Sequence, residues 1–235
     1  MIKSLATLLG FALLAGCASH SKIVEKPLPE IKRIAVIPAS NPRVYTLENA
    51  TPPIGYPGQY WVNKNDSRAK QNILNDEIQL KPQSLGDLLT EKVVAALRSR
   101  GLVVEVLESF TRPADDPDNV DYDKISSDAD AILHLWISEV GLYSSHTSVD
   151  YVPRVNAGAK LFVKGREDNV YSEDIYYGVD ARKGKDWAIV PDPKYAYRSF
   201  NAVVSNMDEV RASFTIGVTE IGERMSDQIY RSIPK

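Results

Sequence analysis

The chain has 235 residues, with 28 Lys and Arg against 31 Asp and Glu, which leaves a formal net charge of −3. Nucleic-acid binding depends on an excess of basic side chains that neutralise phosphates, so we expect no nucleic-acid partner for this weakly acidic chain. The length fits one domain with long loops. Cys17 is the single cysteine, so the fold depends on core packing without an internal disulfide.

The first 16 residues have the three parts of a bacterial signal peptide. Lys3 supplies the basic start, the run from Leu5 to Leu14 is apolar, and small residues lead up to Cys17. An apolar run of roughly 12 residues is too short to cross a bilayer, which takes about 20. Residues 1–16 therefore direct export and are not expected to span a membrane.

The sequence Leu14-Ala15-Gly16-Cys17 resembles a lipobox, the motif of bacterial lipoprotein precursors. The resemblance implies that diacylglycerol is attached to the Cys17 thiol, that the chain is cut before Cys17, and that an acyl chain such as palmitate is added. The alternative is a secretory signal in which Cys17 is incidental. In this class an Asp after the cysteine commonly keeps the protein at the inner membrane. Ala18 stands there instead, which implies the outer membrane and a periplasm-facing domain.

Residues 17–31 are interpreted as a lipidated tether, and residues 32–235 as one domain. The tether carries Pro27 and Pro29, charged residues and no sustained apolar period. At ~3.3 to 3.6 Å per residue it extends at most ~50 Å. We therefore expect the domain to act close to the membrane that holds the lipid.

A short apolar run begins the domain. Residues 34–37 are continuously apolar and are followed by Pro38, which predicts a strand buried on both faces. From residue 40 to residue 83 no apolar period is visible and prolines interrupt regular structure. Because this segment is rich in aromatic residues, we expect an ordered loop whose rings either pack on the sheet or form a partner-binding surface.

A helix and another strand follow this loop. Ser84 with Asp87 matches a capping box, apolar residues recur on one face up to Leu97, and Gly101 is placed to end the helix. Residues 102–107 are rich in Val and Leu and predict a strand. A strand, a helix and a second strand indicate a right-handed parallel crossover.

Aspartates cluster between residues 115 and 123, which raises the question of a calcium site. An EF-hand calcium loop that began at Asp116 would need Gly at its sixth position and Glu at its twelfth. This chain has Asp121 and Ser127 at those positions. The neighbouring Pro113 and Pro117 favour a solvated turn instead. We expect no metal site and no cofactor.

The stretch 128–141 gives the clearest strand prediction, because apolar and β-branched residues occupy both faces around Trp136. Residues 157–163 and 170–177 predict two further strands, separated by turn-forming residues. We expect these three strands to form an antiparallel meander. His134 lies inside the first of them, which favours a hydrogen-bonded core residue over a catalyst.

Several short segments resemble a group of outer-membrane lipoproteins, namely Ala129-Asp130-Ala131-Ile132-Leu133, Ile137-Ser138-Glu139-Val140-Gly141, Ala157-Gly158-Ala159-Lys160-Leu161 and Val170-Tyr171-Ser172. The group comprises the curli-secretion lipoprotein family, related lipoproteins without an assigned role and, more distantly, the penicillin-binding-protein activator LpoB and the amino-terminal domain of TolB. The resemblance covers residues 31–178 and implies an α/β fold with a non-enzymatic task in the envelope. Segment 40–83 is longer than the connection expected in that group, so the binding partner of a group member is not assigned to this chain. Segment 142–156 is too polar and short for membrane-inserted strands of ~9 to 11 residues, which argues against a pore.

The chain ends in a strongly amphipathic helix. Ser205 with Asp208 repeats the capping pattern, and apolar residues recur at steps of three and four from Met207 to Ile229. We expect this helix to cover the sheet, and pairing of two copies through its stripe as a homo-oligomer is the alternative. The overall prediction is an α/β fold with a mixed sheet of about five strands, an antiparallel meander and packing helices.

The segment 182–200 is a second aromatic-rich loop, and it could line a groove with segment 40–83.

Catalytic sequence motifs are missing, so an enzyme is not expected. Contact with an envelope protein partner is the first hypothesis. A hydrolase with paired carboxylates and a ligand-binding lipoprotein are the alternatives. The candidate partner-contact residues are Tyr45, Tyr56, Tyr60, Trp61, Trp187, Tyr195 and Tyr197.

Overall fold

The computed structural model describes residues 28–49, 59–108, 110, 119–144, 150–166, 168–178, 180–181 and 184–234. The predicted α/β class is confirmed, with a seven-stranded mixed sheet in place of the smaller one expected. The strands are β1 (Arg33–Ile37), β2 (Thr46–Asn49), β3 (Val103–Val106), β4 (Ala131–Ser144), β5 (Val152–Phe162), β6 (Asn169–Gly178) and β7 (Ala188–Ile189). The helices are α1 (Gln59–Gln79), α2 (Leu85–Ser99), α3 (Phe200–Ser205) and α4 (Met207–Ser232), with short 3-10 turns at η1 (Tyr122–Lys124) and η2 (Pro193–Tyr195).

The sheet order is β3-β1-β4-β5-β6-β7. The parallel pairing expected for the crossover is present, because β1 and β3 are parallel neighbours, with β2, α1 and α2 between them in sequence. The long strand β4 pairs in parallel with β1 near its start and with β2 near its end. Its other edge pairs with β5, which pairs in turn with β6, and both pairings are antiparallel as predicted.

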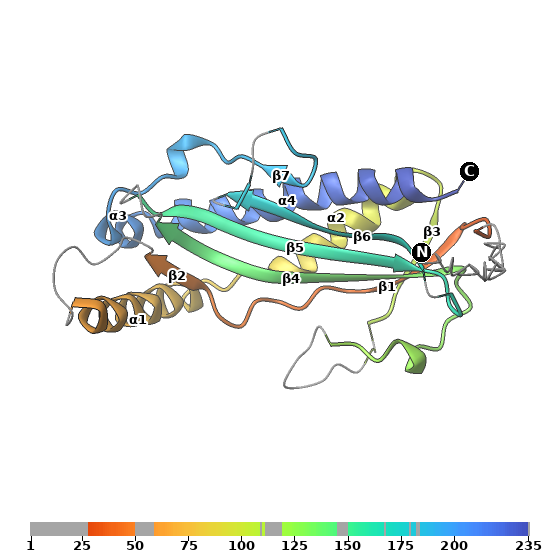
Figure 1. The fold of residues 1–235 in the computed structure, drawn as a ribbon, viewed down its shortest axis with the longest axis horizontal. Helices are drawn as coiled ribbons and strands as arrows, with labels where there is room; N and C mark the ends of the chain where they lie inside the picture. The colour runs from red at the N-terminus through yellow and green to blue at the C-terminus, as the bar shows by residue number, and fades with distance from the viewer. Residues whose placement is uncertain are drawn as a thin grey trace, which may run out of the picture.

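Helices cover one face of this sheet (Figure 1). The stripe of α4 that includes Phe214, Val218 and Ile221 is fully buried, and so is the α2 stripe that includes Leu89 and Val93. The terminal helix therefore packs on its own core, as expected from its wide apolar face. A smaller apolar cluster on Ile37, Val120, Ile125, Ile132 and Phe162 lies apart from this core.

The prediction that segment 40–83 lacks regular structure is wrong. It contains β2 and the 21-residue helix α1, which begins two residues after Pro57. Among the described side chains of α1, Leu74 and Ile78 are buried, so the helix shows little apolar periodicity. Its amide side chains bind β2 instead. Asn75 accepts a hydrogen bond from the Tyr45 amide and donates one to the Tyr45 carbonyl, both at 2.8 Å.

The helix starts also differ in detail from the capping prediction. Ser84 is the residue before α2, but its side chain makes no capping hydrogen bond, and Asn41 accepts the Gly86 amide at 2.7 Å instead. Ser205 ends α3, and α4 follows after Asn206. The predicted final helix therefore begins one residue later than its expected cap at Ser205 implies, and α3 before it was not predicted. A side-chain cap is present at α3, where Ser199 accepts the Ala202 amide at 3.1 Å.

The second aromatic segment, 182–200, likewise contains regular structure, namely β7, η2 and the first residue of α3.

The predicted signal peptide, the lipidation site Cys17 and most of the tether lie outside the described residues. Ile31 is 3% exposed and belongs to the core, so the folded domain begins at or before this residue. No helix in the described part of the chain is long and apolar enough to cross a membrane.

Candidate interaction groove

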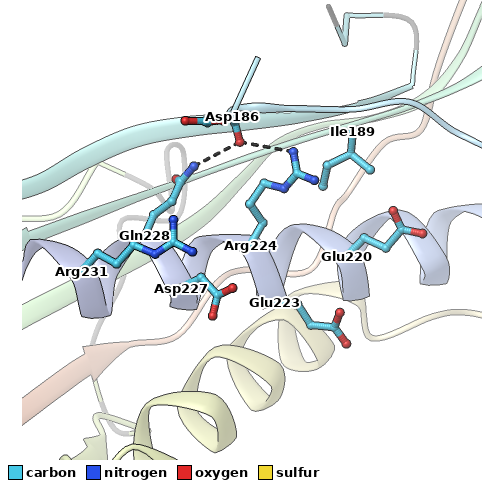
Figure 2. A pocket seen from close by; sticks show the side chains of 8 residues that line it. All are labelled: Asp186, Ile189, Glu220, Glu223, Arg224, Asp227, Gln228 and Arg231. Carbon is cyan, nitrogen blue, oxygen red and sulfur yellow. Dashed lines mark hydrogen bonds between the residues drawn. The ribbon is translucent and has the colours of Figure 1, made fainter. Parts of the chain in front are cut away.

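The side of α4 that faces away from the core is polar. Its residues at helical spacing include Glu220, Glu223, Arg224, Asp227 and Gln228. This follows from the amphipathic pattern, since an apolar stripe that packs on a sheet leaves the opposite stripe to solvent. The polar stripe meets the chain segment that leads into β7 (Figure 2).

Two side chains of α4 hold that segment by its backbone. Arg224 donates to the carbonyl oxygens of Ala188 at 2.7 Å and of Asp186 at 3.3 Å. Gln228 donates to the Asp186 carbonyl at 3.1 Å and accepts from the Tyr171 hydroxyl at 2.7 Å. Helix, strand β6 and the edge segment are thereby fixed to one another, so the walls of the groove are preorganised.

A groove made of two adjoining hollows runs between α4 and this edge of the sheet. The larger has a volume of about 640 Å³ and the smaller about 340 Å³, and both open to solvent. They share Asp186, Gln228 and Arg231. The larger hollow is also lined by Ile189, Glu220, Glu223, Arg224 and Asp227, and the smaller by Tyr171, Glu173, Trp187 and Ser232.

Carboxylates outnumber cations in this lining. Five acidic side chains face two arginines, and Arg224 is already engaged by backbone carbonyls. Asp227 is paired with Arg100, the residue that follows α2. Burial, together with the neighbouring Glu223, raises the pKa of Glu220 above its ordinary value. The groove therefore favours a positively charged ligand or partner.

Trp187 is the sequence-predicted contact residue that lines the groove. Its ring is half-buried and meets Tyr176 edge to face, with ring centroids 5.4 Å apart. Three other candidates are core residues and not surface residues: Tyr45 stacks on Phe214, while Tyr195 and Tyr197 are at most 7% exposed. These three rings therefore pack within the folded domain and do not form a partner-binding surface. Tyr56 and the side chains of Tyr60 and Trp61 lie outside the described residues.

The histidine within the central strand is a core residue, as predicted. His134 is 1% exposed, and its Nδ1 is 2.9 Å from the Tyr122 hydroxyl. The question of metal binding by the aspartate cluster falls largely outside the described residues. Within the described ranges, no group of three or more His, Cys, Asp or Glu side chains is arranged to hold a metal ion.

A polar cluster on the sheet at Arg154 was not predicted from the sequence. The side chain of Arg154 is 11% exposed and forms ion pairs with Glu139 at 2.8 Å, Asp180 at 2.9 Å and Glu48 at 3.0 Å. It also lies over the Tyr143 ring. These groups come from four separate segments, so only the tertiary fold brings them together. The pairing of one arginine with three carboxylates ties β2, β4 and β5 together.

No known family model matches the chain, and no curated protein matches it in sequence. Similar folds occur among solved structures. A protein of the DUF330 family from Xanthomonas campestris has a TM-score of 0.44 at 12% identity, with 88% of this chain and 87% of that chain covered. A protein from Chlamydia trachomatis has a TM-score of 0.37 at 12% identity, covering 85% and 98%. Lipoprotein GNA1162 from Neisseria meningitidis has a TM-score of 0.30 at 17% identity, covering 77% and 97%.

Identities and scores this low transfer no function to the present chain. The specific resemblance to the curli-secretion, LpoB and TolB group is not among these matches and stays a prediction from sequence.

Proposed function

We propose that this chain is a lipid-anchored protein of the outer membrane that acts by protein–protein contacts, as an accessory or assembly factor of an envelope or secretion complex. The observation that carries the proposal is the preorganised groove between α4 and the β6–β7 edge. It is wide and open, it is lined mainly by charged side chains, and it ends at the half-buried ring of Trp187.

The character of the groove supports a protein partner over a small apolar ligand. Small-molecule sites are mostly apolar and enclose most of the ligand surface. Here both hollows are open to solvent, and the larger one has charged or amide side chains at every lining position except Ile189. Aromatic rings such as that of Trp187, placed beside charged groups, are typical of protein contact surfaces.

Crosslinking in living cells tests this proposal. A photoreactive amino acid in place of Trp187 or Trp61 should give crosslinks to envelope proteins, whereas the same residue in place of Leu80, which is 73% exposed, is the control. Crosslinks should disappear when Cys17→Ser prevents lipid attachment. Failure to recover an envelope partner from either tryptophan position would contradict the proposal.

A hydrolase that acts on cell-wall or glycan material is the second candidate, and one observation favours it. Glu220, with its raised pKa, lies in the same hollow as three other carboxylates, and glycoside hydrolysis uses a protonated and an ionised carboxyl group. Incubation of the purified protein with peptidoglycan should then release reducing ends, and Glu220→Gln should abolish the release. Inactive wild-type protein would remove this candidate.

A further inference from the structure

The first part of β6 has an open outer edge. The Tyr176 amide donates to the Trp187 carbonyl at 2.9 Å, which places this backbone group on the β7 side. Because backbone groups two residues apart on a strand point the same way, those of Ser172 and Asp174 point to the same edge. Strand β7 pairs only with Tyr176 and Tyr177. No described residue pairs with the backbone of Ser172 or Asp174 along this edge.

The opposite edge of the sheet, at β3, is protected, unlike the outer edge of β6. The guanidinium group of Arg98 donates two hydrogen bonds, at 2.7 and 3.2 Å, to the outward-facing carbonyl of Val104 in β3. Proteins commonly block exposed edge strands in such ways to prevent unwanted pairing. Among the described residues, no side chain blocks β6 comparably, so this edge is accessible to another strand.

The smaller hollow of the groove lies beside this edge. Tyr171 and Glu173 contribute to it from β6, and Gln228 and Arg231 contribute from α4. Its volume of about 340 Å³ leaves room for side chains of a strand added in line with β7. Trp187 lines the hollow where β7 begins.

We propose that an extended segment of an envelope protein, bearing lysine or arginine at alternate positions, adds to the outer edge of β6 as a strand. The backbone of Ser172 and Asp174 supplies the hydrogen bonds, while the side chains of Glu173 and Asp186, which line the hollow, select for positive charge. A second copy of this chain fits poorly, because pairing β6 with its own copy brings Glu173 and Asp174 close to the same carboxylates of that copy. This inference rests on the proposed function and names the partner's chemistry.

Binding of defined peptides to the lipidated full-length protein in detergent tests the inference. The probe is a dye-labelled eight-residue peptide of alternating Lys and Val, measured by fluorescence anisotropy. The comparison peptides are one of alternating Glu and Val, and a Lys–Val peptide methylated on every backbone nitrogen, which cannot donate the ladder hydrogen bonds. We expect saturable binding of the first peptide only. In its presence, hydrogen exchange should slow at Ser172 and Asp174.

Variants of both sheet edges make the test specific. Glu173→Lys with Asp186→Lys should weaken binding at least about tenfold through charge reversal. Ser172→Pro should weaken it by removing an outward amide that β5 does not use. Glu105→Lys changes an exposed carboxylate on the protected edge strand β3 and should leave binding within about twofold, since it lies far from β6. Equal binding of the methylated or the acidic peptide, unchanged exchange in β6, or formation of a dimer through this edge would overturn the inference.

The two proposals fail separately. If cellular crosslinks from Trp187 persist while the Lys–Val peptide does not bind, strand addition is wrong and the contact function stands. If the peptide binds but no crosslink to an envelope protein forms, the contact function is wrong, and strand addition in the cell falls with it.

Discussion

At the scale of single residues, Asp130 explains part of the sequence pattern that suggested a lipoprotein family. It is the middle residue of Ala129-Asp130-Ala131, and its carboxylate accepts the backbone amides of Lys32 at 2.9 Å and Arg33 at 2.7 Å. The motif therefore joins the start of β4 to the start of β1. This is a structural role, so the motif gives no information about a partner.

Removal of this carboxylate should lower stability in a pH-dependent way. The two amides hold the pKa of Asp130 below its ordinary value, so its contribution is present above the unfolded pKa of ~3.9 and is lost as pH falls through the folded value. Asp130→Ala should cost about 1 kcal/mol at pH 7, which is less than the ~1.5 to 3 kcal/mol of a typical hydrogen bond to a charged group, because solvent screens the site. Chemical denaturation at pH 7 and pH 2 measures this difference, which should be smaller at the lower pH.

The Glu220 side chain should behave in the opposite sense. Its pKa is raised by burial and by Glu223, so the ionised form is less favourable in the folded state than in the unfolded chain. This penalty is absent below the unfolded pKa of ~4.3 and complete above the folded value. Glu220→Gln should therefore raise Tm at pH 7 and leave it unchanged near pH 3. Glu91→Gln on α2 is the control for replacing a carboxylate by an amide. A Tm of Glu220→Gln below that of the unaltered protein at pH 7 would contradict the account.

At the scale of elements, α4 depends on a close approach to β6. A β-carbon added at Gly217 would lie 2.7 Å from the Tyr177 ring, which is fully buried and has little freedom to move. Glycine is therefore required at this crossing for steric reasons, and not for its backbone angles.

Gly217→Ala should destabilise the fold by about 1 to 3 kcal/mol, because overpacking outweighs the gain in helix propensity of ~1 kcal/mol. Gly222→Ala on the same helix is the matched comparison, since its added carbon would meet a side-chain atom of Lys92 at 3.0 Å and no ring. We expect a much smaller change there. Thermal unfolding of both variants measures the difference, and equal midpoints would show that the Tyr177 contact is not limiting.

Elements with apolar periodicity could be predicted from sequence, and those held by polar contacts could not. The runs at β1 and β4 and the stripes of α2 and α4 each bury apolar side chains at regular spacing. In contrast, α1 is joined to β2 by Asn75, whose partner Tyr45 lies 30 residues away, and such a contact leaves no local pattern. The cap of α2 by Asn41 was missed for the same reason.

The groove shows the same limit. Trp187 could be singled out because it lies in the aromatic-rich segment 182–200, whereas Glu220, Arg224 and Gln228 have the pattern of an ordinary solvated helix face. Their role in the groove depends on the segment at Asp186, which lies more than 30 residues earlier and is brought over α4 only by the fold. The open edge of β6 also depends on where β7 begins, which the sequence did not predict.

At the scale of the whole molecule, the proposed anchor limits where the groove can act. The chain from Cys17 to Ile31 spans at most ~50 Å when fully extended. The domain itself is held together by one large core beneath the sheet, and Ile31 already belongs to it. A partner that binds the groove must then lie no farther from the membrane than ~50 Å plus the length of the domain.

Lipid attachment is the claim on which this arrangement depends, and mass spectrometry of the mature amino terminus tests it most directly. Protein extracted from membranes should begin at Cys17 and carry the added mass of a diacylglycerol group, with a further acyl chain on its amine. A mature chain that begins elsewhere, or that begins at Cys17 with a free thiol, would contradict the account.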